Sequence, residues 1–193
     1  WALAEQVSGD VPKFCAEMTK KAKEIGARDT VFGSPNGLDS HLTAEQHHST
    51  AYDMALIGAY ALENETFREI IAQQEIHVSD LTGGHSCSVT NADRFLREYS
   101  GALGIKTGYT NRAGHCFVGA AERDGVRLVS AVLGSGWGDA GKQKKWTDTK
   151  ALMDYGFAAF HPYEAVQAGK PFGEIRITDS PTAQMEAILA EGY

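Results

Sequence analysis

The sequence is poor in the features that mark several common classes of protein. Only three cysteines occur among 193 residues, Cys15, Cys87 and Cys116, and this small odd number indicates no disulfide framework. The count is compatible with one disulfide and a free thiol, or with three buried thiols. No apolar run approaches the length of a membrane span. Lysine and arginine total 18 against 25 acidic residues, a net charge of -7, and the one basic cluster, at 142–145, is too small for a nucleic-acid surface.

What is present indicates a folded body. Hydrophobic residues make up 42% of the chain, which supplies a packed core and excludes general disorder. A length of 193 residues suffices for one domain and part of another. We expect the boundary near 161, with residues 1–160 in the first domain and 161–193 at the beginning of a small all-β domain.

The first part of the chain has helical periodicity. Residues 1–8 predict the end of a helix, and Asp10 is a cap for a second helix that begins near Val11. Its apolar face repeats at helical spacing and consists of Phe14, Cys15, Met18, Ala22 and Ile25. Residues 27–43 predict a loop. Further helices are expected from Thr50, in a capping box with Asp53, through Leu62, and over 65–72. A short strand follows at 75–78.

The second part is rich in strand patterns. Strands are predicted over 103–109, 114–123 and 126–133, and Asp124-Gly125 is typical of a two-residue hairpin turn. Residues 134–141 predict a flexible glycine-rich loop. A helix over 143–159 should turn Trp146, Leu152, Met153 and Phe157 towards the sheet. Short strands are expected at 173–178 and 183–190.

Lys106-Thr107-Gly108 is the most informative motif. An apolar stretch ends there in a cation, a hydroxyl and a residue that has no side chain. On a strand at the side of a groove, these residues would hold an anionic substrate and let another chain approach the backbone closely. K-T-G is one of three motifs found together in serine acyl-transferases that react with β-lactams.

The neighbours of this triplet carry a resemblance to a known family. They occur in a fixed order along the chain: Pro35-Asn36-Gly37-Leu38-Asp39, Ser49-Thr50-Ala51-Tyr52-Asp53-Met54-Ala55, Asn91-Ala92-Asp93-Arg94-Phe95-Leu96, Ala113-Gly114-His115-Cys116-Phe117-Val118 and Leu152-Met153-Asp154-Tyr155-Gly156-Phe157. From about residue 1 to 160 the chain resembles the serine-type D-alanyl-D-alanine carboxypeptidases, which are low-molecular-mass penicillin-binding proteins. The family's S-x-x-K motif is absent, because no serine here has a lysine three residues later. Ser34-Pro35-Asn36 matches the letters of the family's S-x-N motif but lies where the family has a turn.

The resemblance implies that the catalytic groups are divided between this chain and a preceding segment. The family's S-x-N motif stands just before a helix that would continue here as residues 1–5, so we expect the nucleophilic serine and its base lysine on a preceding segment. Lys106 and Thr107, with Gly108 beside them and Thr110 assisting, match the positions that bind the substrate carboxylate. The backbone N–H of Tyr109 matches the family's oxyanion donor. Lys145 matches a basic residue at the start of the last helix, near the groove.

The implied fold is α/β: the penicillin-binding-protein and β-lactamase-like transpeptidase arrangement, an antiparallel sheet flanked by helices. The implied function is removal of the terminal D-Ala from peptidoglycan stem peptides through an acyl-enzyme, outside the cytoplasmic membrane, with acylation by β-lactam antibiotics and no cofactor. A β-lactamase-type hydrolase of the same superfold and a non-catalytic peptidoglycan-binding module remain as alternatives.

Two groups of metal-ligand residue types have a plainer interpretation. His41, Glu45, His47 and His48 lack the H-E-x-x-H spacing that puts two ligands on one helical face. We interpret them as a polar loop and an exposed helix start. The histidine and cysteine pairs at 85–87 and 115–116 contain no C-x-x-C, so a zinc site is not predicted there either.

Overall fold

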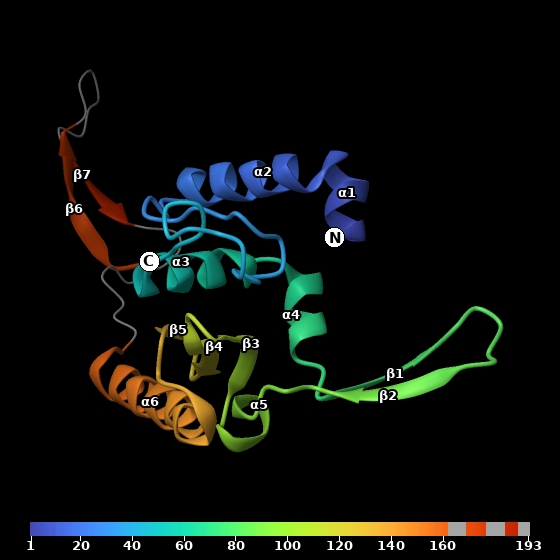
Figure 1. Ribbon diagram of the computed structural model, residues 1–193. Coiled ribbons are helices and arrows are strands. Elements are labelled where there is room, and N and C mark those ends of the chain that lie inside the picture. Colours follow the sequence, from blue (N-terminus) through green and yellow to red (C-terminus); the bar gives the residue numbers. More distant parts are fainter. Residues whose placement is uncertain (162–168, 177–183, 189–193) are drawn as a thin grey trace. The chain divides into compact units, whose positions relative to one another are not determined.

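The computed structural model describes residues 1–161, 169–176 and 184–188. The chain forms two compact units, Trp1–Ala159 and Phe160–Tyr193. The first contains the following elements: α1 (Ala2–Ser8), α2 (Val11–Glu24), α3 (Ala51–Ala61), α4 (Glu65–Ile71), β1 (Glu75–Ser79), β2 (Ser86–Thr90), α5 (Phe95–Glu98), β3 (Ala102–Thr110), β4 (Gly114–Arg123), β5 (Val126–Val132) and α6 (Gly138–Ala159) (Figure 1).

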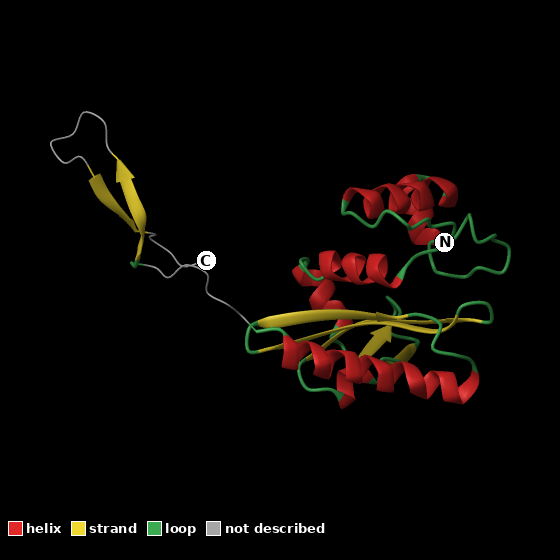
Figure 2. Ribbon diagram, turned by 90° about the vertical axis from the view of Figure 1, so that its left-hand side faces the viewer, coloured by secondary structure: helices red, strands yellow, loops and turns green. Residues whose placement is uncertain are grey.

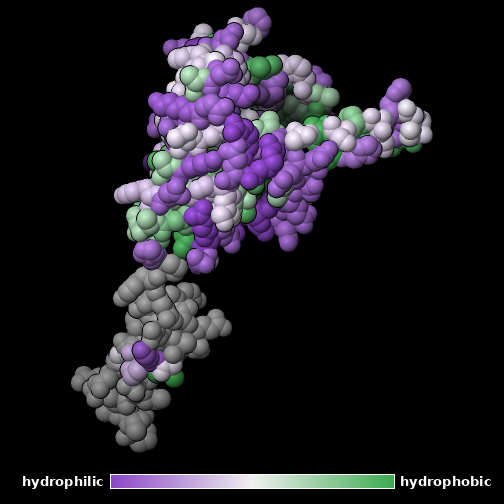
Figure 3. Space-filling view, turned by 90° about the horizontal axis from the view of Figure 1, so that it is seen from below, coloured by the Kyte–Doolittle hydropathy of each residue, from purple (hydrophilic) through white to green (hydrophobic). Residues whose placement is uncertain are grey.

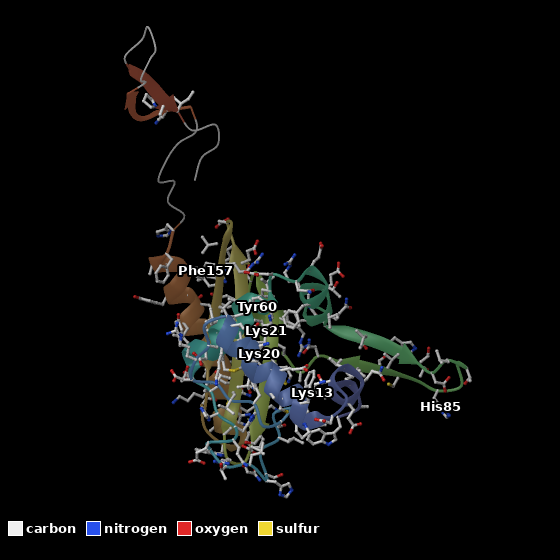
Figure 4. All side chains as sticks on the ribbon, turned by 90° about the horizontal axis from the view of Figure 1, so that it is seen from above. Lys13, Lys20, Lys21, Tyr60, His85 and Phe157 are labelled. Atoms are coloured by element: carbon white, nitrogen blue, oxygen red, sulfur yellow. The ribbon has the colours of Figure 1, made fainter. Side chains whose placement is uncertain are left out.

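The cap at Asp10 is confirmed. Its side chain accepts the backbone N–H of Lys13 at 2.7 Å, and α2 begins at the next residue. The helix buries Cys15 and Ala22, in agreement with the predicted apolar face. Its lysines are exposed, and Lys21 approaches the ring of Tyr60 in α3 at 6.0 Å from the centroid (Figure 4).

The sheet of this unit has three antiparallel strands in the order β3-β4-β5. Helix α3 covers one face and α6 the other, and the layer of α2 and its following loop lies beyond α3 (Figure 2). Gly58 lets α3 sit close to the sheet, because a Cβ there would lie 3.0 Å from a methyl of Val118 and 3.1 Å from one of Ile105. The Asp124-Gly125 hairpin joins β4 to β5 as predicted.

The core lies between the sheet and α6. It is built from Phe95, Phe117, Ala121, Trp146 and Met153, which are at most 3% exposed. Phe117 meets Trp146 edge to face with 4.8 Å between the ring centroids. The predicted inward direction of Leu152 is wrong, because this side chain is 48% exposed. Seen from below, the side of the unit that carries α6 is largely hydrophilic with smaller hydrophobic areas (Figure 3).

The loop predicted over 134–141 is confirmed only for residues 134–137, and residues 138–141 are helical. Helix α6 begins at Gly138, five residues earlier than expected. Gly136 and Gly141 pack so closely that a Cβ on Gly141 would lie 2.2 Å from the carbonyl carbon of Gly136. The hydroxyl of Ser135 donates to the carbonyl oxygen of Gly141 at 2.9 Å. These glycines therefore serve close backbone packing at the start of the helix.

Two short elements were not predicted. Strand β2 pairs antiparallel with β1, and both strands are exposed along their whole length. This hairpin projects from the body of the unit, with His85 at its far end (Figure 4). The single helical turn α5 begins at Phe95, whose N–H donates to Asp93 at 2.8 Å. Both elements are too short for sequence periodicity to reveal.

The second unit contains the antiparallel strands β6 (Pro171–Arg176) and β7 (Gln184–Ile188). The remaining parts of the predicted strands, at 177–178, 183 and 189–190, lie outside the described residues. That this unit begins an all-β domain stays a prediction. The three cysteines are unpaired; Cys15 is buried, Cys87 exposed and Cys116 half-buried rather than in the core. In the described part of the chain, no helix combines the length and hydropathy needed to span a bilayer.

Candidate active site

The Lys106-Thr107-Gly108 triplet lies in the second half of β3, which is the outer strand of the sheet. Within the described ranges, no strand pairs with the other side of β3. Such an edge presents unpaired backbone donors and acceptors to whatever lies beside it. The motif therefore sits where an extended chain can add to the sheet.

The direction of the backbone groups on this edge follows from the neighbouring strand. The N–H of His115 donates to Gly136, and its carbonyl accepts from Ser135, both at 2.9 Å. The peptide groups of His115 thus face away from β3. Its partner Tyr109 then belongs to a pair without mutual hydrogen bonds, so the N–H and C=O of Tyr109 face the open edge. Thr107, two residues earlier, has the same orientation.

Lys106 and Gly108 are exposed on this edge. The ammonium of Lys106 donates to the carbonyl oxygen of Thr107 at 2.5 Å, which keeps the charge beside the strand. A Cβ placed on Gly108 would have no atom within 4 Å. The open edge thus combines a positive charge with free space next to the backbone.

Lys145 approaches the same region from α6. It is only 5% exposed, and its Nζ lies 4.5 Å from the centroid of the Trp146 ring. Burial lowers the pKa of Lys145; the Asp93 carboxylate raises it, and the positive charge of Lys106 adds to the lowering. The structure therefore brings the two predicted cations within electrostatic reach of each other.

Asp93 lies within electrostatic reach of Lys145, and its position in the sequence did not single it out as a candidate. It is 3% exposed; its Oδ1 accepts the N–H of Phe95, and its Oδ2 has no hydrogen-bond partner in the described part of the chain. Burial raises the pKa of its carboxyl, while the hydrogen bond from the N–H of Phe95 and, after it, the charge of Lys145 lower it. In the sequence, Asp93 lies within the run 91–96, which is one of the segments that carry the family resemblance.

Thr110 and Tyr109 are held by contacts at the end of β3. The Thr110 hydroxyl donates to Asp39 Oδ2 at 2.8 Å and accepts the N–H of Ala113 at 2.9 Å. The phenol of Tyr109 donates to the side chain of Asn111 at 3.1 Å. Sequence reasoning had placed Asp39 in a turn and given it no role.

Two clefts lie elsewhere on the surface. One, of about 490 Å³, is lined by Arg68, Arg123 and Arg127 among others, and the second, of about 1070 Å³, lies between α2 and the segment 31–46. The predicted site residues line neither. The candidate site in this chain is therefore the exposed edge of β3 with two cations. It is bounded on one side only.

The other candidate groups are engaged in local contacts. His47 Nδ1 accepts the N–H of Gly33 at 3.2 Å, and His48 Nδ1 lies 2.7 Å from the carbonyl oxygen of Ala44. The hydroxyl of Ser34 donates to Asn36 at 2.7 Å, and Ser34 is 3% exposed. The geometry of Ser34 is that of a structural serine in a bend.

Comparison with known proteins gives a consistent result. Residues 1–136 match the peptidase S11 family, described as D-alanyl-D-alanine carboxypeptidase. The chain is similar to D-alanyl-D-alanine carboxypeptidase DacF of Bacillus subtilis strain 168, with 29% identity over 190 residues, which are 98% of this chain and 46% of that protein. It is also similar to DacB2 of Mycobacterium tuberculosis, with 38% identity over 143 residues, 74% of this chain and 47% of that protein. The chain spans about half the length of these curated relatives.

Solved structures agree with this likeness. Penicillin binding protein 5 from Haemophilus influenzae superimposes with a TM-score of 0.76 and 28% identity, over 100% of this chain and 53% of that one. D-alanyl-D-alanine carboxypeptidase from Mycobacterium tuberculosis gives a TM-score of 0.70 and 36% identity, over 82% of this chain and 58% of that one. The predicted fold class, an antiparallel sheet flanked by helices in the penicillin-binding-protein arrangement, is confirmed.

Proposed function

We propose, because the chain belongs to the D-alanyl-D-alanine carboxypeptidase family, that it forms the substrate-binding strand and one oxyanion donor of a serine D-Ala-D-Ala carboxypeptidase. The nucleophilic serine and its base lysine would reside on a segment before Trp1, which would also form the opposite wall of the groove. The observation that carries this proposal is the open edge of β3, towards which the N–H of Tyr109 points beside the charge of Lys106.

The substrate is a peptidoglycan stem peptide that ends in D-Ala-D-Ala. An extended peptide can add to the edge of β3 as a further strand, through backbone hydrogen bonds to Thr107 and Tyr109. The space beside Gly108 admits this close approach. The terminal carboxylate then reaches Lys106 and the hydroxyl of Thr107, with Lys145 contributing charge from α6.

Electrostatics favours an anion at this position. Lys106 is close enough to Lys145 that its positive charge contributes to the lowered pKa of Lys145. The exposed cation of Lys106 and the buried cation of Lys145 repel each other, and a carboxylate between them relieves that repulsion. The carboxylate of Asp93 acts in the opposite sense, because it raises the pKa of Lys145 and favours the charged ammonium.

The reaction follows from these positions. The serine oxygen forms a bond to the penultimate carbonyl carbon, and the N–H of Tyr109 stabilises the resulting oxyanion. The C–N bond then breaks, D-Ala leaves with a proton on its amine, and water hydrolyses the ester to restore the serine. Removal of one oxyanion donor typically costs about 2.7–4 kcal/mol of barrier, so the position of the Tyr109 backbone is decisive. β-Lactams would acylate the same serine, and the protein would act outside the cytoplasmic membrane.

The test uses the protein encoded by the complete gene. We expect it to be labelled covalently by a fluorescent penicillin, to lose the label slowly, and to release D-Ala from a stem-peptide analogue. Lys106→Ala should slow both reactions, whereas Lys13→Ala, which removes an exposed lysine on α2, should change neither. Rapid loss of the label would identify a β-lactamase. Binding of peptidoglycan without any labelling would identify a binding module, and either result would refute the proposal.

A further inference from the structure

We infer that Asp39, in the loop after α2, is a positioning residue for the catalytic strand. It acts through Thr110 and keeps the end of β3, and with it the N–H of Tyr109, in the geometry that the reaction needs. This inference rests on the proposed function. It makes the loop at 27–43 a part of the active site, although its sequence predicts only a connecting turn.

The contact between the two residues is direct and directional. Thr110 Oγ1 lies 2.8 Å from Asp39 Oδ2 and 2.9 Å from the nitrogen of Ala113. Because the hydroxyl accepts the N–H of Ala113, its own hydrogen is available for the carboxylate. Asp39 thereby orients the hydroxyl that closes the β3–β4 turn. A hydrogen bond to a charged group is among the stronger kinds in proteins.

Two further contacts hold the same turn. Arg112 donates through Nη1 to the carbonyl oxygen of Leu42 at 2.6 Å, and the indole N–H of Trp137 donates to the carbonyl oxygen of Asn111 at 2.8 Å. The turn at 110–113 is therefore attached to the loop at two points and to the start of α6 at a third. Asp39 makes the attachment closest to Tyr109 along the chain.

The loop that carries Asp39 is itself well anchored. The N–H of Leu42 donates to the carbonyl oxygen of Asp39 at 3.1 Å, and Gly33 donates its N–H to the ring of His47. Val31 and His48 exchange two backbone hydrogen bonds of 3.0 Å. A fixed loop can set the position of a strand end, whereas a mobile loop would only follow it.

The contact affects the reaction through the position of the Tyr109 N–H. Tyr109 is the residue next to Thr110, and its N–H must meet a developing oxyanion within hydrogen-bonding range. A displacement of about 1 Å at a reacting centre is enough to cost about 100-fold in rate. Loss of the Asp39 contact should therefore lower the rate of acylation, because the strand end moves, without removing any group that touches the substrate.

The experiment measures acylation by a penicillin in the complete protein. Asp39→Ala and Thr110→Val should each slow acylation by about tenfold or more, as expected for the loss of a charge-assisted hydrogen bond. The double variant should be no slower than the slower single variant, since both remove one contact. Thr110→Ser, which keeps the hydroxyl, should recover most of the rate that Thr110→Val loses. Multiplied losses in the double variant, or parental rates in either single variant, would overturn the inference.

A matched control lies in the β1–β2 hairpin. There the hydroxyl of Thr82 donates to Asp80 at 2.8 Å, the same chemistry at the same distance on an exposed turn. Thr82→Val should leave acylation unchanged. If Thr82→Val slows acylation as much as Thr110→Val, the effect reflects general loss of a threonine–aspartate contact, and the inference fails.

Backbone hydrogen exchange separates this inference from the proposed function. If the parent protein is not acylated at all, the proposed function fails, but the contact is still measurable. Asp39→Ala should then speed exchange of the amide of Ala113, which donates to the Thr110 hydroxyl, and leave the amides of β4 and β5 as protected as in the parent. Unchanged exchange at Ala113 would show that Asp39 does not position the strand end.

Discussion

The carboxylate of Asp53, in the first turn of α3, accepts the hydroxyl hydrogen of Thr30 at 2.7 Å, with both residues at most 3% exposed. The same oxygen accepts the N–H of Asp29 at 2.8 Å. One buried acid thus attaches the loop after α2 to the helix that covers the sheet. The same loop carries Asp39, so the stability of this attachment bears on the site.

Asp53→Ala should destabilise the protein by about 2 kcal/mol or more, because it takes the carboxylate acceptor from the buried hydroxyl of Thr30 and from the N–H of Asp29. Urea denaturation measures this free energy of unfolding. Thr50→Ala removes only the helix cap that binds the N–H of Asp53 at 3.1 Å, and should cost about 1 kcal/mol. Equal losses in the two variants would contradict the role given to Asp53.

Asp53 also shows why sequence reasoning identified the helix but misjudged the contact. The spacing of Thr50 and Asp53 predicts a capping box, and the Thr50 half of it is present. The carboxylate instead binds residues 29 and 30, which are more than twenty positions away in sequence. Local patterns report local hydrogen bonds, and no pattern within α3 indicates that a distant loop returns to it.

The same limit applies to the site. The triplet at 106–108 and its strand could be predicted, because an apolar run, a cation and glycine stand next to one another in sequence. The open edge required the pairing of β3 with β4, and the roles inferred for Asp39 and Asp93 required tertiary contacts. The segment 138–141 was misjudged because glycine serves close packing as well as flexibility, and composition does not distinguish these uses.

His47 gives the protein a dependence on pH. Burial lowers the pKa of its ring below the usual value of 6.5, and its Nδ1 accepts the N–H of Gly33. A group whose pKa is lower in the folded state stabilises the fold above the unfolded pKa and loses that contribution as the pH falls through the folded pKa. The free energy of unfolding should therefore decline below about pH 6.5.

The variant His47→Gln should show a smaller decline than the parent between pH 7.5 and 5.5, when chemical denaturation is measured at each pH. His41→Gln, which alters an exposed histidine, is the matched control and should keep the parental slope. If His47→Gln keeps the parental slope as well, the ring is not the group responsible.

Gly108→Ala tests whether a chain approaches the edge of β3. A Cβ at this position meets no atom within 4 Å, so the fold should tolerate it, and stability should stay within about 1 kcal/mol of the parent. Acylation by a penicillin should nevertheless fall by about 100-fold, since the methyl group displaces the bound ligand. Gly173→Ala, in the equally open surroundings of β6, should change neither property. Normal acylation of Gly108→Ala would place the substrate elsewhere.

Lys145 should determine the pH at which the rate of acylation by a penicillin declines on the alkaline side. The groups that act on it are Asp93, Cys116, Lys142 and Lys106, and burial is the largest cause of its lowered pKa. A lysine binds a carboxylate only while it is protonated, so acylation should decline as the pH rises through this lowered pKa. Arginine keeps its charge throughout, and Lys145→Arg should therefore move the decline to higher pH.

The variant Asp93→Asn should shift the alkaline decline of acylation in the opposite direction, to lower pH. The amide keeps the oxygen that accepts the N–H of Phe95 but removes the negative charge that raises the pKa of Lys145. The pKa of Lys145 should fall further, and the alkaline decline should begin at lower pH than in the parent. In the double variant Asp93→Asn/Lys145→Arg, this shift should disappear, because the arginine stays charged whatever faces it. A shift that persists in the double variant would mean that Asp93 acts on another group, and Lys145 would lose its place in the site.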